Sequence, residues 1–402
     1  MANILGIIAF ALGIGLTVAL HEAGHMLTAR AFGMRVRRYF IGFGPRLFSF
    51  TRGHTEYGLA ALPVGGFCDI AGMTAQDEFL TEEEEPYAMY KKPAWQRVIV
   101  MSGGILVNIV LGFALLFGVA LTAGLPDLHA DLRPKVGEVV CSADQIDAEH
   151  YAECTGAGPA GEAGVETGDI VLALDGQPLE SFAQLREEVI GKPGQTVTLT
   201  VERDGRVLDL PVHLDTVKRL TTEGELIDAG SIGLTNQPVN IMVKHDAVSA
   251  VPATAEYSWT LAKSTVTAIG RIPSQIPGIV TSIFGQERSE DSPMSVVGAS
   301  RVGGELVERS LWSTFFMMLA SLNYFLALFN LIPLPPFDGG HIAVIAYEKV
   351  RDSVRKVRGL APLGPADYTR LMPVTYVMAA ILMTFGALVI VADVVNPIRL
   401  FG

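Results

Sequence analysis

Four apolar stretches set the strongest constraint on how this chain can fold. They cover residues 4–31, 98–121, 311–332 and 372–395. About 20 apolar helical residues are enough to cross the hydrocarbon core of a bilayer. Half of the 402 residues are apolar and the mean hydropathy is +0.37, which is high for a globular protein of this length. The sequence therefore predicts a polytopic α-helical membrane protein with about four spans.

The first stretch has one alternative interpretation, a secretory signal peptide. Such a peptide has a basic n-region and a cleavage site with small residues. Here only Met1-Ala2-Asn3 precedes the apolar run, and Leu20-His21-Glu22 stands where cleavage would be expected. We therefore interpret this stretch as a membrane span.

The motif His21-Glu22-Ala23-Gly24-His25 ends the apolar run of the first span. Helical residues four apart share one face, so His21 and His25 can bind one metal ion with Glu22 beside them as general base. The HExxH pattern arises by chance in roughly one chain in a hundred of this length. However, ionisable residues in a span are costly and usually functional. The motif therefore predicts a zinc hydrolase in a membrane.

A catalytic zinc ion has three protein ligands and one open position, so a third ligand must come from elsewhere. The candidates are Asp338, His341 and Asp393. Asp338 follows a Pro-rich segment and precedes two glycines, where irregular backbone can aim a ligand at the first span. We interpret His341 as a neighbour of the site, and Asp393 lies at the wrong depth. Cys68 could also be a ligand, but we interpret it as a buried thiol.

Charge is unevenly distributed along the chain. Residues 127–291 contain 26 acidic and 12 basic residues, whereas the rest of the chain has a net charge of +2. The loops at 31–97 and 341–371 are rich in Arg and Lys, so the positive-inside rule makes them cytoplasmic. The N-terminus, the acidic middle and the C-terminus are then outside, and HExxH lies towards the cytoplasm. The net charge of −12 argues against nucleic acid as a partner.

Cys141 and Cys154 both lie in the segment that we expect outside. An oxidising compartment would allow them to form a disulfide. Spacing alone does not show the geometry, so two free thiols are the alternative.

Residues from about 135 to 216 have the pattern of a small folded module. Ser181 can cap a helix, an Asp-Gly turn marks a hairpin, and the expected helix and strands cover residues 170–174, 182–190, 196–201 and 207–212. This order, with the stretches EAGVETGDIVLALDGQPL and VTLTVERDG, resembles a PDZ domain. PDZ domains bind extended peptides at a sheet edge. The alternative is a β-rich spacer without a ligand, because no carboxylate-binding loop is evident.

Two motifs taken together resemble those of a known family. HExxH on the first span and NxxPxPxxDG at residues 330–339 are the paired signatures of the site-2 protease family of intramembrane zinc proteases. The PDZ-like insert is similar to that of bacterial regulators of sigma-factor proteolysis. The segments GGFCDIAGM and NPIRLF resemble the actinobacterial branch. The resemblance covers nearly the whole chain, and it implies that His21, His25 and Asp338 bind one Zn²⁺ ion while Glu22 activates water.

The resemblance also implies substrate contacts. Asn108 lies in the second span, Asn323 and Asn330 lie in the third, and polar residues in spans often face a bundle interior. Asn330 heads the second motif and would hold the substrate backbone or the oxyanion, with Asn323 assisting. A membrane-associated β segment of the family, which would present an edge to an unwound substrate, is matched here around Gly42, Gly44, Gly65 and Gly66. The chain departs from many relatives at Ser102-Gly103-Gly104, where they have Ala-Gly-Pro.

These features divide the chain into eight segments. They are the first span (1–32), a cytoplasmic loop with the β segment (33–97), the second span (98–124), an extracytoplasmic PDZ-like α/β domain (125–216), a linker that can hold an amphipathic surface helix (217–310), the third span with NxxPxPxxDG (311–341), a basic cytoplasmic loop (342–371), and the fourth span with the tail (372–402).

The resemblance implies a zinc-dependent intramembrane endopeptidase of the bacterial cytoplasmic membrane. Its substrates would be single-pass membrane proteins, such as anti-sigma factors or remnant signal peptides, cut first by an upstream site-1 protease. The alternatives are a membrane-embedded PDZ scaffold and a metal sensor, each with a vestigial HExxH. A scaffold predicts a damaged motif, yet the four site residues are intact. A sensor or transporter predicts ionisable residues along a path through the spans, but here they gather at one depth.

Overall fold

The computed structural model describes residues 2–130, 133–146, 150–220, 226–237, 242–286, 288–289 and 291–398. The chain divides into two compact units, a helical unit made of Met1–Leu125 and Lys244–Gly402 and a β-rich unit made of Pro126–Val243. Four helices of the helical unit are long and apolar enough to cross a membrane. The predicted polytopic α-helical fold with four spans and a β-rich insert is therefore confirmed.

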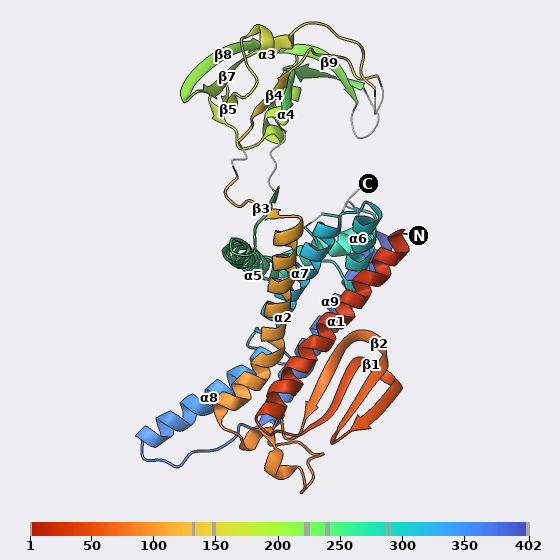
Figure 1. Cartoon of the computed structure of the whole chain (residues 1–402), viewed down its shortest axis with the longest axis vertical. Coiled ribbons are helices and arrows are strands. Elements are labelled where there is room, and N and C mark those ends of the chain that lie inside the picture. The colour runs from red at the N-terminus through yellow and green to blue at the C-terminus, as the bar shows by residue number, and fades with distance from the viewer. Residues whose placement is uncertain are drawn as a thin grey trace. The chain divides into compact units, whose positions relative to one another are not determined.

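The four span helices are α1 (Ala2–Ala31), α2 (Ala94–Thr122), α7 (Trp312–Asn330) and α9 (Met372–Val395). The axes of these helices are roughly aligned with one another (Figure 1), and α2 packs against both α1 and α7. Glycine permits the approach of α1 to α2, because a Cβ on Gly24 would lie 2.4 Å from the Gly103 carbonyl oxygen. Small residues at such crossings are a usual way for helices to pack in a bilayer.

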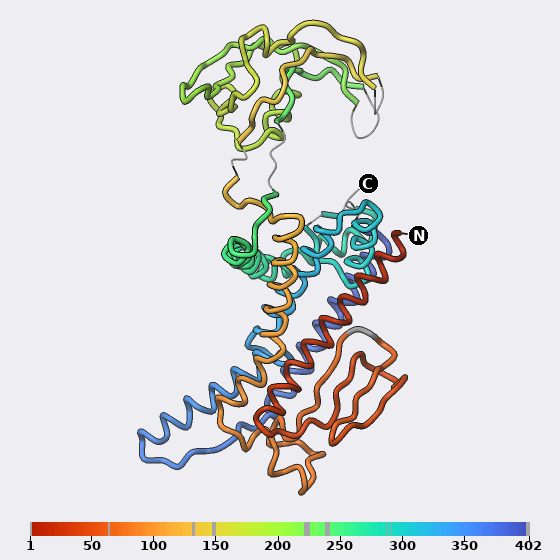
Figure 2. The backbone as a smooth tube through the Cα atoms, in the orientation of Figure 1, coloured from red at the N-terminus to blue at the C-terminus, as the bar shows by residue number. Residues whose placement is uncertain are grey.

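A hairpin of two long strands, β1 (Val36–Arg52) and β2 (Thr55–Ile70), lies between α1 and α2 in the sequence. Each strand bends, so residues 38–41 of β1 lie opposite both residues 56–59 and residues 66–69 of β2. Figure 2 shows the backbone of these bent strands, which lie beside α1. The hydroxyl of Tyr39 donates a 2.6 Å hydrogen bond to the Ala19 carbonyl of α1. The register pairs residues 66–69 on one side only, so they form an edge of this sheet.

Short 3-10 helices, η1 (Glu85–Tyr87) and η2 (Met89–Lys91), precede α2. After α7 the chain turns through a Pro-rich segment into α8 (Asp338–Val357), and η3 (Tyr368–Leu371) leads into α9. The expected third segment (311–341) and basic loop (342–371) are therefore wrong in their boundaries, since most of the loop is helical. Asp338 in the first turn and basic residues in the last turn of α8 favour this helix through its dipole. The buried pair Arg97–Glu348, at 2.6 Å, joins α8 to α2.

Residues 217–310 are not a linker. Strands β9 (Asp215–Leu220), β10 (Leu226–Ser231), β11 (Leu234–Asn236) and β12 (Met242–Val243) extend the β-rich unit, and two helices follow, α5 (Ala250–Ile283) and α6 (Val296–Glu308). Pro273 and Pro277 lie inside α5 without ending it. In Figure 1 α5 is seen end-on while the spans are seen from the side, so its axis crosses theirs. It packs against α2, α7 and α9.

The β-rich unit contains the elements expected of the PDZ-like module, with a four-stranded sheet in the order β6-β5-β7-β8. Ser181 caps its helix by accepting a hydrogen bond from the Gln184 amide. The module does not end at residue 216, because β11 pairs with β4 and Ile232 enters the core. The remaining elements of the chain are β3 (Leu125–Pro126), β4 (Val136–Val139), α3 (Gly158–Glu162), β5 (Ile170–Leu174), β6 (Gln177–Pro178), α4 (Phe182–Ile190), β7 (Thr196–Arg203) and β8 (Arg206–His213).

The structure joins Cys141 and Cys154 in a disulfide, with their Cα atoms 5.9 Å apart. Just after Cys141 the chain lies against β9, where Asp144 accepts a 2.8 Å hydrogen bond from the Lys218 amide. Cys68 is a buried free thiol.

The carboxyl group of Asp169 provides a pH test of the β-rich unit. Burial raises its pKa, but hydrogen bonds from Arg203 and from the Glu166 amide outweigh burial, so its pKa is below the ordinary value. A group with a lowered folded-state pKa stabilises the fold above its unfolded pKa, and this contribution is lost as pH falls through the folded value. We expect the protection of the β5 and β7 amides from hydrogen exchange, corrected for the intrinsic exchange rate, to decrease when the pH is lowered past about 4.

Hydrogen exchange measured on full-length protein checks this expectation. Asp169→Asn should lower protection at pH 7 and weaken its dependence on pH in the acid range. Asp215→Asn, at an exposed position of the same unit, should keep the wild-type response. An unchanged pH response in Asp169→Asn would contradict the assigned role.

The C-terminal end of α9 is held by a buried ion pair. The Arg288 guanidinium lies 2.7 Å from Asp393 Oδ1, and the two side chains are only 2% and 1% exposed. The Ser295 amide donates a 2.6 Å hydrogen bond to the other carboxylate oxygen of Asp393.

Removing one partner of a buried pair leaves an uncompensated charge, so Asp393→Ala should lower the free energy of unfolding by about 3–5 kcal/mol. Thermal unfolding in detergent should show a smaller loss for the double variant Arg288→Met/Asp393→Leu, and an equal loss would contradict this explanation.

Candidate metal centre

Three side chains from two helices converge at one point. His21 and His25 come from α1, and Asp338 is the first residue of α8. The Nε2 atoms of the two histidines are 3.3 Å apart, and they lie 3.4 and 3.3 Å from Oδ2 of Asp338. Ligand atoms about 2.0–2.1 Å from a tetrahedral zinc ion are separated by roughly 3.3 Å. The triangle therefore has the size of one face of a tetrahedral zinc site.

Two further observations show that these residues fit a metal ion. Oδ2 of Asp338 is buried and has no hydrogen-bond partner of good geometry among the described residues. A Cβ on Gly104 of α2 would lie 2.4 Å from Nε2 of His25 and 2.7 Å from Nε2 of His21. The glycine therefore keeps clear the space in front of the ligand atoms. This arrangement suits a catalytic zinc ion, which needs three ligands and an open position.

Helix α2 holds the other ring nitrogen of each histidine. Nδ1 of His25 lies 2.8 Å from the Val100 carbonyl oxygen, and Nδ1 of His21 lies 3.2 Å from the Asn108 amide. An imidazole that binds metal through Nε2 carries its proton on Nδ1 and donates it to an acceptor. Asn108 Oδ1 is buried without a partner in the described chain, and turning the amide over makes it that acceptor. From the sequence, Asn108 could be identified only as a polar residue in a span, and its contact with His21 could not be predicted.

Glu22 lies between the metal triangle and the sheet. Its carboxylate accepts a hydrogen bond from the backbone N–H of Cys68 in β2. A Cβ on Gly66 would lie only 3.1 Å from Cγ of Glu22, so the strand passes very close to this side chain. The predicted general base therefore lies beside both the metal ligands and the sheet edge formed by residues 66–69.

The two asparagines of α7 occupy different places. Asn323 is fully buried, and its Nδ2 lies 3.3 Å from Thr17 Oγ1, one helical turn before His21 on α1. Asn330 is the last residue of α7, and within the described chain no hydrogen bond joins it to the three ligands. The structure therefore brings Asn323 to within about a turn of the ligands and leaves Asn330 at the entrance to the Pro-rich segment.

The predicted glycines of the β segment also separate into two groups. Only Gly66 packs against Glu22 and Val18 of α1. Three others have positive φ values where the strands bend, 88° for Gly42, 86° for Gly44 and 146° for Gly65. Such backbone conformations favour glycine, so these three shape the sheet, whereas Gly66 makes room beside the general base.

The remaining candidates lie outside the metal triangle. His341 stacks on Tyr368 with ring centroids 5.5 Å apart, which agrees with its interpretation as a neighbour. Asp393 pairs with Arg288, and Cys68 packs in a buried apolar cluster. Among the described residues, the triangle of His21, His25 and Asp338 is the one group of this kind that can hold a metal ion.

Comparison with known proteins agrees with this site. The model of Peptidase family M50 matches residues 9–362. The chain is 45% identical over 403 residues to zinc metalloprotease Rip1 of Mycolicibacterium smegmatis, covering 99% of each chain. It is 43% identical over 406 residues to zinc metalloprotease Rip1 of Mycobacterium tuberculosis H37Rv, covering 100% of each. A more distant relative is the membrane metalloprotease ARASP of Arabidopsis thaliana, 29% identical over 83% of this chain and 68% of that protein.

Among solved structures, the PDZ domain of an SdrC-like protein from Listeria monocytogenes matches 27% of this chain and 92% of its own, at 17% identity. Its TM-score of 0.19 is too low to carry an argument. The family match spans most of the chain and includes all four residues of the HExxH and Asp338 set. This chain therefore belongs to peptidase family M50, the site-2 proteases, and is a zinc metalloendopeptidase.

Proposed function

We propose that this protein cleaves peptide bonds within the membrane spans of single-pass proteins, such as anti-sigma factors or remnant signal peptides, in regulated intramembrane proteolysis. The observation that carries the proposal is the position of the metal triangle. His21 and His25 lie on α1, a helix apolar enough to cross a membrane, and Glu22 stands beside a one-sided sheet edge. A substrate must therefore lie in the bilayer to reach the site.

His21, His25 and Asp338 would hold the zinc ion, with Val100 and Asn108 orienting the two rings. A bound zinc ion supplies a Lewis acid and lowers the pKa of a bound water towards 7. Glu22 accepts the proton of the attacking water and then donates it to the leaving amide nitrogen. Asn330 would donate a hydrogen bond to the substrate carbonyl or its backbone as charge develops on the oxygen. Asn323 would assist from inside the bundle, since its amide nitrogen is hydrogen-bonded to Thr17 and to the Leu319 carbonyl.

The substrate must be extended before it can be cut. A peptide bond within a transmembrane helix is shielded by the hydrogen bonds of that helix. Residues 66–69 of β2 offer backbone groups on their free side, and the Cys68 N–H already points at Glu22. A substrate strand that pairs with this edge would place its carbonyl groups beside the general base.

We infer the bacterial cytoplasmic membrane as the location of this multi-pass protein, with α8 on the cytoplasmic side. The basic loops at 31–97 and 341–371 favour this orientation. The disulfide between Cys141 and Cys154 suits an oxidising exterior for the β-rich unit. The amphipathic surface helix predicted for the 217–310 segment would be α5, whose exposed Trp259, Val266 and Ile276 can enter the outer lipid interface.

The exterior PDZ-like domain supports a role for a second protease. A bulky exterior domain on a substrate would be kept from the spans until an upstream site-1 protease had removed it. The two relatives named zinc metalloprotease Rip1 match this chain over nearly their full length, so their exterior domain is shared.

Changing Glu22 to Gln tests the role of the general base. The amide keeps the shape of the side chain but cannot accept a proton, so Glu22→Gln should retain zinc and lose cleavage by about 10²–10⁴-fold. Membrane proteomics of cells with wild-type protein or Glu22→Gln should show truncated single-pass proteins accumulating only in the variant. Identical profiles, with the variant still active on a purified substrate, would contradict the proposed mechanism.

Zinc content of purified protein tests the metal site directly. Asp338→Ala removes a ligand and should lower zinc content to well below one ion per chain. Gly104→Ala should have a similar effect, because its Cβ would fill the space in front of His25 Nε2. The matched controls are Asp352→Ala on α8 and Gly118→Ala on α2, where a Cβ meets nothing within 4 Å. Full zinc occupancy in Asp338→Ala would remove this residue from the ligand set.

A further inference from the structure

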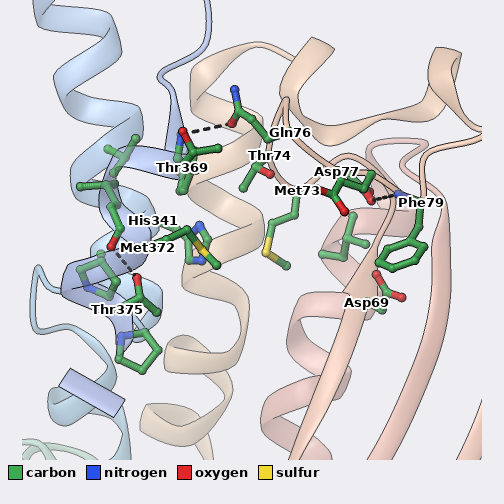
Figure 3. A pocket seen from close by; sticks show the side chains of 18 of the residues that line it. Asp69, Met73, Thr74, Gln76, Asp77, Phe79, His341, Thr369, Met372 and Thr375 are labelled. Carbon is green, nitrogen blue, oxygen red and sulfur yellow. Dashed lines mark hydrogen bonds between the residues drawn. The ribbon is translucent and has the colours of Figure 1, made fainter. Parts of the chain in front are cut away.

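A cavity of about 690 Å³ lies next to the metal centre. Figure 3 shows His341, Met372 and Thr375 on one side of it and the loop after β2, from Met73 to Phe79, on the other. The first wall comes from α8 and α9. The volume lies within the range of about 300–1,000 Å³ that is usual for ligand sites. No role in the mechanism above uses this space.

The cavity continues the catalytic edge of the sheet. Its lining includes Asp69 and Ile70, the two residues that follow Cys68 in β2. On the other side it includes Pro336 and Gly340, which flank Asp338 in sequence. A strand paired along residues 66–69 would therefore pass Glu22 and then enter the cavity.

The walls of the cavity are held in place by hydrogen bonds. The Tyr368 amide donates a 3.1 Å bond to Gln76 Oε1, which joins the α8–α9 connection to the loop after β2. Within that loop the Asp77 carboxylate accepts bonds from the amides of Gly72 and Phe79, at 2.8 and 3.1 Å. The cavity is therefore built from a braced loop and two helix ends.

The lining combines apolar walls with negative charge. The apolar side chains belong to Ile70, Met73, Phe79, Val344, Leu371 and Met372. Three carboxylates line the cavity, those of Asp69, Asp77 and Glu78, together with the guanidinium of Arg37, which pairs with both aspartates at 3.0 and 2.7 Å. Asp69 also pairs with Arg38 at 2.9 Å, so Glu78 carries the uncompensated negative charge. Glu78 is exposed and has no ion-pair partner in the described part of the chain.

We propose that this cavity binds the stretch of substrate just beyond the cleaved bond on the α8 side, taking bulky apolar side chains of the span and placing a following Lys or Arg beside Glu78. The inference rests on the proposed function and adds a specificity site to it. The end of a span at the cytoplasmic face is typically an apolar run followed by basic residues. The cavity offers both complementary features, apolar walls and the carboxylate of Glu78, which has no ion-pair partner among the described residues.

Two synthetic single-span peptides test the charge preference with full-length protein in liposomes. They share an apolar span of about 20 residues, and the flank on the α8 side carries three lysines in one and three serines in the other. Wild type should cleave the lysine probe with a kcat/KM about fivefold higher. Glu78→Lys should abolish or reverse this preference. Glu82→Lys should keep it, because Glu82 is exposed and unpaired among the described residues of the same loop but does not line the cavity.

Two variants of α9 test the position of the substrate. Thr375→Trp should raise KM for both probes about tenfold by filling the cavity, whereas Met383→Trp, on an exposed part of α9, should not. In a Glu22→Gln background, Thr375→Cys should form a disulfide with a cysteine in the probe flank, and Met383→Cys should not.

The outcomes separate this inference from the proposed function. Failure of wild type to cleave either probe would contradict the proposed function. Equal cleavage of both probes, or an unchanged lysine preference in Glu78→Lys, would overturn the cavity assignment alone. The same holds if Thr375→Cys forms no cross-link while wild type cleaves the probes.

Discussion

The close approach of α1 to α2 is the contact on which the site depends. Gly24 lies inside the HExxH motif, and its lack of a side chain lets the backbone of Gly103 come within van der Waals distance. This approach brings the Val100 carbonyl and the Asn108 amide to the ring nitrogens of His25 and His21. It also places Gly104 in front of the ligand atoms, where space is needed. Helix α1 supplies the two histidines of the metal triangle, and α2 sets the orientation of their rings and keeps the space in front of them open.

The spans, and the order of helix and strands in the β-rich unit, could be predicted because each depends on residues that are near one another in the sequence. Long apolar runs predict spans, and Ser181 with the Asp-Gly turn predicts a helix and a hairpin of the insert. HExxH also needs only helical periodicity. The structure differs from the expected linker at 217–310 because part of that segment completes an earlier module, where β11 pairs with β4. Ile232 enters a core built mainly from residues 136–214, and local patterns do not show such a partner.

Sequence patterns do not predict which side chains of the site meet across different helices. Asn108 and His21 are separated by 87 residues, and Asn323 and Thr17 by 306. Each asparagine appears in the sequence as an isolated polar residue in an apolar run, which indicates burial without naming a partner. For the same reason, the Pro-rich segment and the two glycines favour Asp338 among three candidates, and the family resemblance implies its role as a ligand. The helix that begins at Asp338 was missed because the basic residues after it suggested a loop.

The sheet edge at residues 66–69 has a consequence that follows from the bilayer itself. Lipid offers no hydrogen bonds, so an open strand edge at membrane depth must be covered by protein or line a water-filled space. Here the Glu22 carboxylate accepts a hydrogen bond from the Cys68 amide, and in the proposed mechanism that carboxylate takes the proton of the attacking water. A substrate strand that pairs along this edge would satisfy the neighbouring backbone groups and bring its own carbonyl groups beside Glu22. Leaving the backbone N–H and C=O groups of this edge without hydrogen-bond partners costs free energy when no substrate is bound. Pairing with an extended substrate removes that cost, so these groups favour the extended form of the substrate over its helix.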